Sequence, residues 1–276
     1  MLFLSSRLRC GEMSQVEIIS IGNELLIGKV TNTNASWLAD KITRLGGKVR
    51  RIVVVADDLG EIASSIREAI ARGTRLIITT GGLGPTYDDM TLSGIAGCFG
   101  LEMEVNEEAL DLIKAKYESK GWELTPARRK MAIFPRGARP IPNPVGTAPA
   151  MKLEVKDGVV YALPGVPSEM EAIFDEYVAK EIKEKLGCMS FGEAHLMLRG
   201  VPESSLAPLL DEVRAKNVGV YIKSHPKGVE AGQSLIEVHF TCHGTTEEDA
   251  NKLASEAASD LAKLVEKKFN VRPSTT

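Results

Sequence analysis

Two adjacent carboxylates, Asp88 and Asp89, end a glycine-rich segment with the sequence TGGLGPTYDD, residues 80–89. Glycines allow a ligand to approach the backbone, and exposed amide groups form a nest that binds anions. A helix that begins near Thr91 would add the positive end of its dipole. Carboxylates repel a phosphate unless the two groups share a divalent metal ion. The segment therefore predicts a phosphate site with a metal at the two aspartates. The alternative is a tight turn followed by Asp89 as a helix cap.

A second polar segment, GNELLIGKVTNTN at residues 22–34, offers hydrogen-bond donors and acceptors. They suit the sugar and base of a nucleotide, or a pterin ring. Glu24 follows a predicted buried strand, and a carboxylate near Asp88 or Asp89 would complete a metal or base site. The alternative is a solvated loop in which Thr33 or Asn34 caps the next helix.

Two stiff segments, NPVGTAPA (residues 143–150) and LPGVPSEM (residues 163–170), carry few charges. Proline and glycine fix their backbone shape, so they would form a wall around a ligand. The alternative for both is an ordinary connection between elements. From all four segments, the candidates for catalysis are Asp88, Asp89 and Glu24, with Asp88 and Asp89 as metal ligands. The candidates for ligand binding are Gly22, Asn23, Asn32, Asn34, Thr80, Gly81, Gly82, Gly84, Thr91, Asn143, Gly146, Thr147, Pro164 and Gly165.

Other polar residues receive a structural interpretation. The sequence has four histidines, His195, His225, His239 and His243. None of them shows metal-ligand spacing with neighbouring acids. Alternation places His239 and Cys242 in a strand. The ARRK run at residues 127–130 is typical of a solvated helix face, although one of its arginines could reach a phosphate. No Walker A, G-x-S-x-G, H-E-x-x-H or G-x-G-x-x-G motif occurs.

A scaffold must bring these segments together. Runs of apolar and β-branched residues predict strands at residues 16–21, 49–55 and 75–79, and apolar residues at helical spacing predict helices between them. Such alternation indicates a parallel sheet with helices on both faces. Ligands bind at the carboxyl edge of such a sheet. The segments that begin at Gly22 and Thr80 both emerge at that edge, although they are far apart in the sequence.

The rest of the chain predicts a second, smaller unit. Asp157-Gly158 is a hairpin turn signal, and Gly187 marks a boundary. Other helices are predicted near residues 91–99, 106–119 and 203–216. Residues 164–168 lead into a further helix that runs to about 186, and a last helix has an apolar face between residues 250 and 265. The other strands lie near 194–199, 218–223 and 234–241. We therefore expect a disordered or over-annotated start at residues 1–13, an α/β domain at 14–186 and a small α+β domain at 190–270.

Composition argues against other classes of protein. The formal net charge of the 276 residues is -3, whereas a nucleic-acid surface needs excess Lys and Arg. No apolar run approaches the roughly 18 residues that span a bilayer. The four cysteines are far apart, which argues against a zinc knuckle or a disulfide framework. A reducing cytoplasm is the expected location.

The four segments together resemble the amino-terminal domain of the CinA family, which belongs to the MogA/MoeA-like molybdopterin-binding superfamily. The resemblance covers residues 16–186. Residues 190–270 are similar to the small KH-like domain that follows in CinA proteins, but they lack an evident G-x-x-G loop. The resemblance implies a three-layer α/β/α fold with a mostly parallel sheet, a homodimer and a small nucleotide as partner. The net charge and the missing loop argue against a nucleic-acid partner, and the lack of a long apolar run argues against a membrane partner.

The same resemblance implies a metal-dependent hydrolase, an ADP-ribose pyrophosphatase that forms AMP and ribose 5-phosphate. The implied cofactor is Mg²⁺, Co²⁺ or Ni²⁺, with K⁺ as a helper. Asp88 and Asp89 would hold the metal or activate water, the glycines of the TGGLG run would meet the pyrophosphate, and Glu24 and Asn34 would face the ligand. The carboxy-terminal deamidase of bacterial CinA has no counterpart in this sequence, so deamidation of nicotinamide mononucleotide is not expected.

Three further possibilities stay open. A similar domain in eukaryotic FAD synthases hydrolyses FAD. A MogA-like role would be molybdopterin binding or adenylyl transfer during molybdenum cofactor assembly. The third possibility is a module that binds a nucleotide or pterin without turning it over.

Overall fold

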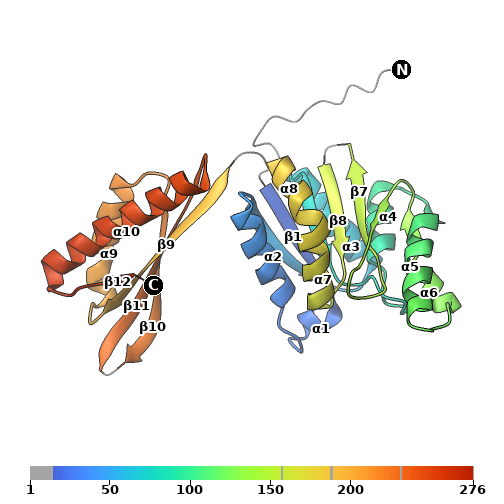
Figure 1. Ribbon diagram of the computed structural model, residues 1–276, viewed down its shortest axis with the longest axis horizontal. Helices are drawn as coiled ribbons and strands as arrows, with labels where there is room; N and C mark the ends of the chain where they lie inside the picture. Colours follow the sequence, from blue (N-terminus) through green and yellow to red (C-terminus); the bar gives the residue numbers. More distant parts are fainter. Residues whose placement is uncertain (1–14, 157, 187–188, 231, 276) are drawn as a thin grey trace, which may run out of the picture. The chain divides into compact units, whose positions relative to one another are not determined.

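The computed structural model describes residues 15–156, 158–186, 189–230 and 232–275. They form two compact units, which Figure 1 shows in the colours of the sequence. The first unit holds residues 15–186 apart from 44–46, and the second holds residues 189–275 together with 44–46. The predicted disordered or over-annotated start at residues 1–13 and the predicted turn residue Asp157 lie outside the described residues.

The first unit is built on a six-stranded sheet with the strand order β2-β1-β3-β8-β7-β6. The strands are β1 (Gln15–Ile21), β2 (Lys48–Val55), β3 (Leu76–Thr80), β6 (Arg139–Ile141), β7 (Ala150–Val155) and β8 (Gly158–Leu163). The first four in spatial order are parallel, while β7 and β6 are antiparallel to their neighbours. The predicted mostly parallel sheet is confirmed, and the β7–β8 hairpin explains its reversed edge.

Helices cover both faces of this sheet. They are α1 (Asn23–Leu26), α2 (Thr33–Arg44), α3 (Leu59–Ala71), α4 (Thr91–Phe99), α5 (Glu107–Ser119), α6 (Pro126–Lys130), α7 (Pro167–Ile173), a π-helical turn (Phe174–Val178) and α8 (Ala179–Leu186). A two-stranded sheet of β4 (Met103–Val105) and β5 (Ile133–Pro135) lies beside them. In Figure 1, α7 and α8 pass in front of the sheet and α3 passes behind it. Because both faces are covered, every residue of β3 is buried.

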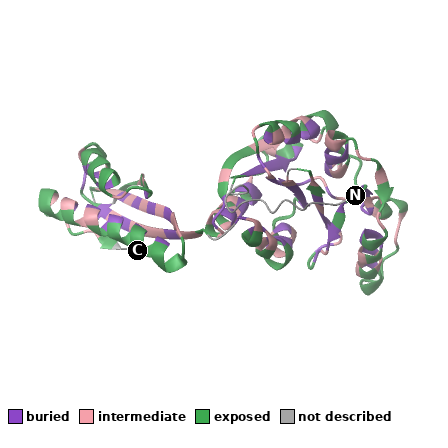
Figure 2. Cartoon of the chain, turned by 90° about the horizontal axis from the view of Figure 1, so that it is seen from above, coloured by how far each residue is buried: buried purple, intermediate pink, exposed green. Residues whose placement is uncertain are grey.

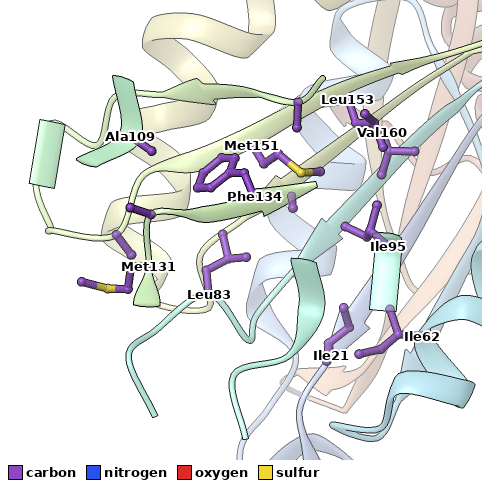
Figure 3. Close-up of a cluster of buried hydrophobic side chains, with 14 of the residues drawn as sticks. Ile21, Ile62, Leu83, Ile95, Ala109, Met131, Phe134, Met151, Leu153 and Val160 are labelled. Atoms are coloured by element: carbon purple, nitrogen blue, oxygen red, sulfur yellow. The ribbon is translucent and has the colours of Figure 1, made fainter. Parts of the chain in front are cut away.

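The glycine-rich segment is anchored by one apolar side chain. Leu83 is only 7% exposed and joins a buried cluster that includes Ile95, Phe134 and Met151. Figure 3 shows Leu83 beneath Phe134, with side chains from the strands and helices around them. Burial of one leucine contributes roughly 1.5–3 kcal/mol. This anchor fixes the segment in place while the glycines on either side leave the backbone bare.

The second unit is the smaller α+β region that the sequence predicts. Its four-stranded antiparallel sheet has the order β10-β11-β9-β12. The elements are β9 (Ser190–Arg199), α9 (Glu203–Lys216), β10 (Tyr221–Glu230), β11 (Gln233–Gly244), α10 (Glu247–Phe269) and β12 (Ser274–Thr275). Alternate residues of its strands are buried with residues of the two helices, and Figure 2 shows this as bands of purple and pink. The similarity of this unit to a KH domain stays a prediction.

No helix among the described residues is both long enough and apolar enough to cross a membrane.

Candidate functional site

Two glycines at the carboxyl end of β3 let the chain turn in a confined space. Gly81 has φ +107°, and a Cβ there would lie 2.1 Å from the carbonyl oxygen of Ile21. Gly82 has φ +65°, and its Cβ would lie 2.4 Å from Thr91 Oγ1. Thr91 in turn donates from Oγ1 to the carbonyl oxygen of Gly81 at 2.8 Å. A side chain at either glycine would therefore push the turn away from β1 or α4.

The first turn of α4 faces this glycine turn. The N-cap residue is Met90, and no side chain caps the helix, so the interpretation of Asp89 as a helix cap is wrong. A hollow of about 110 Å³, here called the first hollow, lies beside it. Its lining includes Gly82, Gly84, Asp89, Ser93 and Lys130. The Thr91 amide donates to the carbonyl oxygen of Gly82 at 3.2 Å. First-turn amides that lack such a partner attract anions, which suits the predicted phosphate.

The two aspartates converge on one hydroxyl group. Thr86 Oγ1 lies 2.5 Å from Asp88 Oδ1 and 2.5 Å from Asp89 Oδ2, and the Thr86 amide donates to Asp89 Oδ2 at 2.8 Å. One hydroxyl proton serves only one carboxylate at a time. The remaining lone pairs of the two carboxylates are thus free to accept from another donor or to bind a cation.

Asp88 is exposed and held in its charged form. The hydrogen bond from Thr86 lowers the pKa of Asp88 most, its own backbone amide adds to this effect, and the charge of Lys130 contributes less. These effects outweigh the slight rise in pKa that burial causes. Asp88 is therefore ionised at neutral pH, as a ligand of a hard cation must be.

Lys130 is the only Lys or Arg that lines the first hollow within the described part of the chain. Its Nζ donates to the carbonyl oxygen of Asp89 at 3.0 Å and also to that of Thr86. The sequence interpretation of residues 127–130 was a solvated helix face, with one of its arginines able to reach a phosphate. Arg128 instead lies over the ring of Tyr117, with 4.5 Å between its guanidinium carbon and the ring centroid. The basic group that reaches the aspartate segment is the lysine.

A larger hollow of about 330 Å³, here the second hollow, shares part of this lining. It is bordered by Asp89 on one side and by Thr147, Pro164, Gly165 and Glu169 on the other. The two stiff proline-glycine segments therefore face the glycine-rich segment across one space. A Cβ at Gly165 would lie 3.3 Å from the Cα of Gly81, which shows how closely the walls approach.

A third hollow, of about 90 Å³, shares Gly165 with the second, so the three hollows form a row. It is lined by Glu24, Asn32, Asn34 and Thr80 among others. The Asn34 amide donates to Thr80 Oγ1 at 3.0 Å and to the carbonyl oxygen of Gly165 at 2.8 Å. Its own oxygen, Oδ1, is buried and has no hydrogen-bond partner among the described residues. A buried acceptor without a partner costs about 1–3 kcal/mol, so it favours a ligand that donates there.

Glu24 does not join the aspartates. Within the described residues, Asp88 and Asp89 belong to no group of three potential metal ligands whose atoms lie within 4.8 Å of one another. The short helix α1 explains this, because it turns the Glu24 side chain back over Gly22, where a Cβ would lie 2.4 Å from Glu24 Oε1. The predicted completion of the metal site by Glu24 is therefore not found.

Some predicted ligand-binding residues also hold the backbone in place. Asn32, and not Thr33 or Asn34, caps α2, since its Oδ1 accepts from the Ala35 amide at 3.2 Å. Asn143 accepts from the amides of Val145 and Gly146 at 3.1 and 2.7 Å. It also donates to the carbonyl oxygen of Ala148 at 2.9 Å and to Glu169 at 2.7 Å. Asn143 therefore shapes the wall of the second hollow without a free polar atom.

The other predicted residues differ in their surroundings. Thr147 Oγ1 accepts from the Tyr117 hydroxyl at 3.2 Å, and Thr147 lines the second hollow. Asn23 is exposed, and its backbone amide donates to Asp57 Oδ2 at 2.8 Å. Gly146 is packed so closely that its Cβ would lie 2.1 Å from the Glu169 carboxylate. The lack of a side chain at Gly146 therefore leaves the space that this carboxylate occupies.

Three residues of the site were missed by sequence reasoning, namely Thr86, Lys130 and Glu169. Thr86 sits inside the glycine-rich segment, and its position three residues before Asp89 is typical of a side chain that closes a local turn. Glu169 lies in the first turn of α7, which begins at Pro167. An acidic residue is common there because it stabilises the helix dipole, so the pattern alone does not indicate a site. Lys130 carries no local signal, because its approach depends on how α6 packs.

Three comparisons relate the chain to known proteins. Residues 17–184 match the protein family described as "Probable molybdopterin binding domain". A protein of Pyrobaculum arsenaticum is 49% identical over 259 residues, which are 94% of this chain and 97% of that protein. A protein of Aeropyrum pernix is 44% identical over 249 residues, which are 90% and 92% of the two chains. The crystal structure of CinA from Thermoplasma acidophilum is similar with a TM-score of 0.58 and 45% identity, covering 62% of this chain and 99% of that chain. The predicted resemblance to the CinA amino-terminal domain is confirmed.

Proposed function

The chain belongs to the family of probable molybdopterin binding domains, and on that premise we propose that it hydrolyses the pyrophosphate of a nucleotide with a divalent metal ion. ADP-ribose is the first candidate substrate, and AMP and ribose 5-phosphate are the products. One observation carries the proposal. The carboxylates of Asp88 and Asp89 converge on Thr86 Oγ1, next to the uncapped first turn of α4. A phosphate and a cation both find complementary groups there.

The donor chemistry fits a hard cation. Two carboxylates and a hydroxyl oxygen are the kind of ligands that Mg²⁺ accepts, together with water and substrate phosphate oxygens. Co²⁺ and Ni²⁺ accept the same oxygens. Asp88 and Asp89 would hold the ion. When bound, it would neutralise charge on the phosphates and lower the pKa of a water molecule.

The groups of the chain itself would bind and orient the substrate. The bare backbone at Gly82 and Gly84 and the first turn of α4 would accept one phosphate. Lys130 would keep Thr86 and the backbone of Asp89 in place. The third hollow would take the sugar or base, where a hydroxyl or amino group would donate to Asn34 Oδ1. Few cations surround the site, so metal and amides would supply the electrostatic stabilisation.

The reaction itself is balanced by one water molecule. The water oxygen forms a bond to one phosphorus atom, and the bond between that phosphorus and the bridging oxygen breaks. The bridging oxygen leaves with the other phosphate, and the protons of the water pass to a carboxylate and then to solvent. No oxidant, reductant or second substrate is needed.

Pterin chemistry is the second candidate function. The observation that favours it is the match of residues 17–184 to a family described as binding molybdopterin. The same row of hollows would then hold the phosphate and the ring system of a pterin, either for adenylyl transfer from ATP or for binding alone.

The deciding experiment incubates the purified chain with ADP-ribose, K⁺ and one of Mg²⁺, Co²⁺ or Ni²⁺, and measures AMP by chromatography. We expect AMP from the wild type, and a loss of at least about a hundredfold in Asp88→Asn and Asp89→Asn while circular dichroism stays unchanged. Asp111→Asn is the matched control, because Asp111 is an exposed acid of α5 paired with Lys114 at 3.1 Å.

Each outcome distinguishes the candidates. Wild-type rates in both aspartate variants, or undiminished turnover after rigorous removal of metal, would refute the metal-site assignment. An absence of AMP with every metal would refute the pyrophosphatase proposal. FAD, and molybdopterin with ATP, are then the substrates to test, and tight binding without product would indicate a binding module. Light scattering on the same preparation tests the predicted homodimer.

A further inference from the structure

Three potential metal ligands gather on the sheet of the second unit, far in sequence from the aspartates. They are His195 on β9 and Glu237 and His239 on β11. His195 and His239 are direct cross-strand partners in the antiparallel register. Glu237 lies two residues before His239, so its side chain points to the same face of the sheet. The sequence showed no metal-ligand spacing because strand pairing, and not proximity in sequence, brings the two histidines together.

The distances within the cluster are short. One ligand atom from each of the three residues lies within 4.8 Å of the others. His239 Nε2 lies 3.1 Å from Glu237 Oε2, and His195 Nδ1 lies 3.5 Å from Glu237 Oε1. The two imidazole rings are 4.3 Å apart between centroids. Both imidazoles therefore flank one carboxylate.

From this geometry we propose that His195, Glu237 and His239 bind a divalent transition-metal ion, with Zn²⁺ as the model ion. Two imidazole nitrogens and one carboxylate oxygen suit Zn²⁺, Co²⁺, Ni²⁺ or Cu²⁺, whereas Mg²⁺ and Ca²⁺ prefer oxygen alone. The inference does not rest on the proposed pyrophosphatase activity.

The side chains of the cluster are partly exposed, although the ligand atom His239 Nε2 is itself buried. The side chains of His195, Glu237 and His239 are 27%, 16% and 32% exposed. The residues that alternate with them, such as Leu196, Val238 and Phe240, are buried in the core formed with α9 and α10. The three ligands thus lie on the sheet face opposite the core, and an ion can bind them without any change in the packing of the unit.

Only side-chain movement is needed to close the site. Zinc ligands lie about 2.1 Å from the ion, so tetrahedral neighbours are roughly 3.4 Å apart. The ligand atoms here, within 4.8 Å of one another, must approach by an ångström or so, which a rotation about the side-chain bonds provides. Three protein ligands leave one position for water or for His225, whose ring lies 4.5 Å from that of His239.

Neighbouring charges supply a competing explanation. Lys227 Nζ lies 2.8 Å from Glu237 Oε2, and Glu193 Oε2 lies 3.6 Å from His195 Nε2. A plain network of ion pairs would account for these contacts without a metal. Lys227 occupies an oxygen that the ion would use, so binding of an ion must displace this ammonium group. If an ion binds here, removal of the lysine should strengthen its binding, whereas a network of ion pairs alone predicts no such gain.

The test is calorimetric titration of the full chain, free of any polyhistidine tag, with Zn²⁺. It is best done in the Asp88→Asn/Asp89→Asn background, so that the carboxylate site of the first unit does not contribute. We expect one equivalent of Zn²⁺ that disappears in His195→Ala/His239→Ala. His243→Ala is the matched control, because His243 lies on the same strand with its ring 5.8 Å from that of Phe191 and outside the cluster.

A second variant tests the competition. Lys227→Ala should tighten Zn²⁺ binding about two- to fivefold, because an exposed ion pair no longer has to be broken. Co²⁺ added to the same samples should give visible absorption bands that the double histidine variant loses. Equal Zn²⁺ stoichiometry and affinity with and without the two histidines would overturn the proposal, and so would weaker binding in Lys227→Ala. If the double variant does not fold, Glu237→Gln replaces it, and unchanged binding in that variant has the same meaning.

Discussion

Glu17 is a buried carboxylate near the amino end of β1, and its removal should destabilise the first unit. The Glu17 side chain is 1% exposed and accepts from Arg72 Nη2 at 2.7 Å and Arg72 Nε at 3.0 Å. Thr74 Oγ1 donates to the same carboxylate at 2.6 Å. Glu17→Gln keeps the shape but replaces one acceptor oxygen with an amide that faces the guanidinium. Two donors then oppose each other around a residue 17 side chain that is almost fully buried.

The expected magnitude follows from burial and from the partner that remains. Removal of one member of a buried ion pair costs about 3–5 kcal/mol. Arg72 is 23% exposed and also contacts Glu68 at 3.3 Å, so water and Glu68 stabilise part of its charge. We therefore expect Glu17→Gln to lower the free energy of unfolding by about 2–4 kcal/mol. Glu68→Gln is the matched control: Glu68 is 62% exposed, and its loss should cost at most about 0.5 kcal/mol.

Urea unfolding followed by tryptophan fluorescence measures this difference. The chain has two tryptophans, and both Trp37 and Trp122 belong to the first unit, so the signal reports on that unit. Glu17 lies near the amino end of β1, about 16 Å along the strand from Gly22. The KM for ADP-ribose should therefore stay unchanged below the melting temperature. Equal losses of stability in the Glu17 and Glu68 variants would refute the reasoning from burial.

Three further predictions concern pH and the site. Burial raises the pKa of Glu17, but hydrogen bonds from Arg72 and Thr74 outweigh it, and the net pKa is lowered. The stabilisation by Glu17 is therefore complete above the unfolded pKa of about 4.3 and is lost as pH falls. The difference in the free energy of urea unfolding between wild type and Glu17→Gln should narrow below about pH 4.5. A difference that stays constant with pH would contradict this. Gly82→Ala places a Cβ 2.4 Å from Thr91 Oγ1 at φ +65°. We therefore expect the free energy of unfolding, measured in urea, to fall by about 1–3 kcal/mol. An unchanged free energy of unfolding would show that the turn is not confined. Lys130→Met removes the donor to the Asp89 carbonyl. We expect kcat/KM for ADP-ribose to fall about tenfold, because the loss of one hydrogen bond that involves a charged group costs about that much, while circular dichroism stays unchanged. Wild-type kinetics in this variant would show that Lys130 is not part of the site.

Local signals predicted the scaffold well where periodicity was strong. Asp58 caps α3 as its position before an apolar helix implies, and its carboxylate accepts from Gly60 and Glu61. Leu38 and Ile42 point into the core from α2. The short elements α1, β4, β5 and β6 were not predicted, because three or four residues carry too little periodicity to separate a strand or turn from a loop.

The site could be predicted only as far as the topology placed it. The carboxyl edge of a parallel sheet brings the segments at Gly22 and Thr80 to the same row of hollows. Their side chains were harder to place. Glu24 folds back over Gly22 because α1 forms, and Asn32 caps α2 because its side chain accepts from Ala35. Such contacts depend on local backbone geometry, which residue types and spacing do not determine.

The two proposed metal sites differ in their ligand atoms, and this difference makes them separable in one molecule. Asp88, Asp89 and Thr86 offer oxygen alone, which suits Mg²⁺. His195 and His239 add imidazole nitrogens, which increase affinity for Zn²⁺ far more than for Mg²⁺. With Mg²⁺ as the only divalent ion, hydrolysis should therefore proceed while the histidine cluster stays empty. Loss of the two histidines should leave that hydrolysis unchanged, and loss of the two aspartates should leave the equivalent of Zn²⁺ bound at the histidines. A variant that lost both properties at once would show that the ion sites are coupled and not independent.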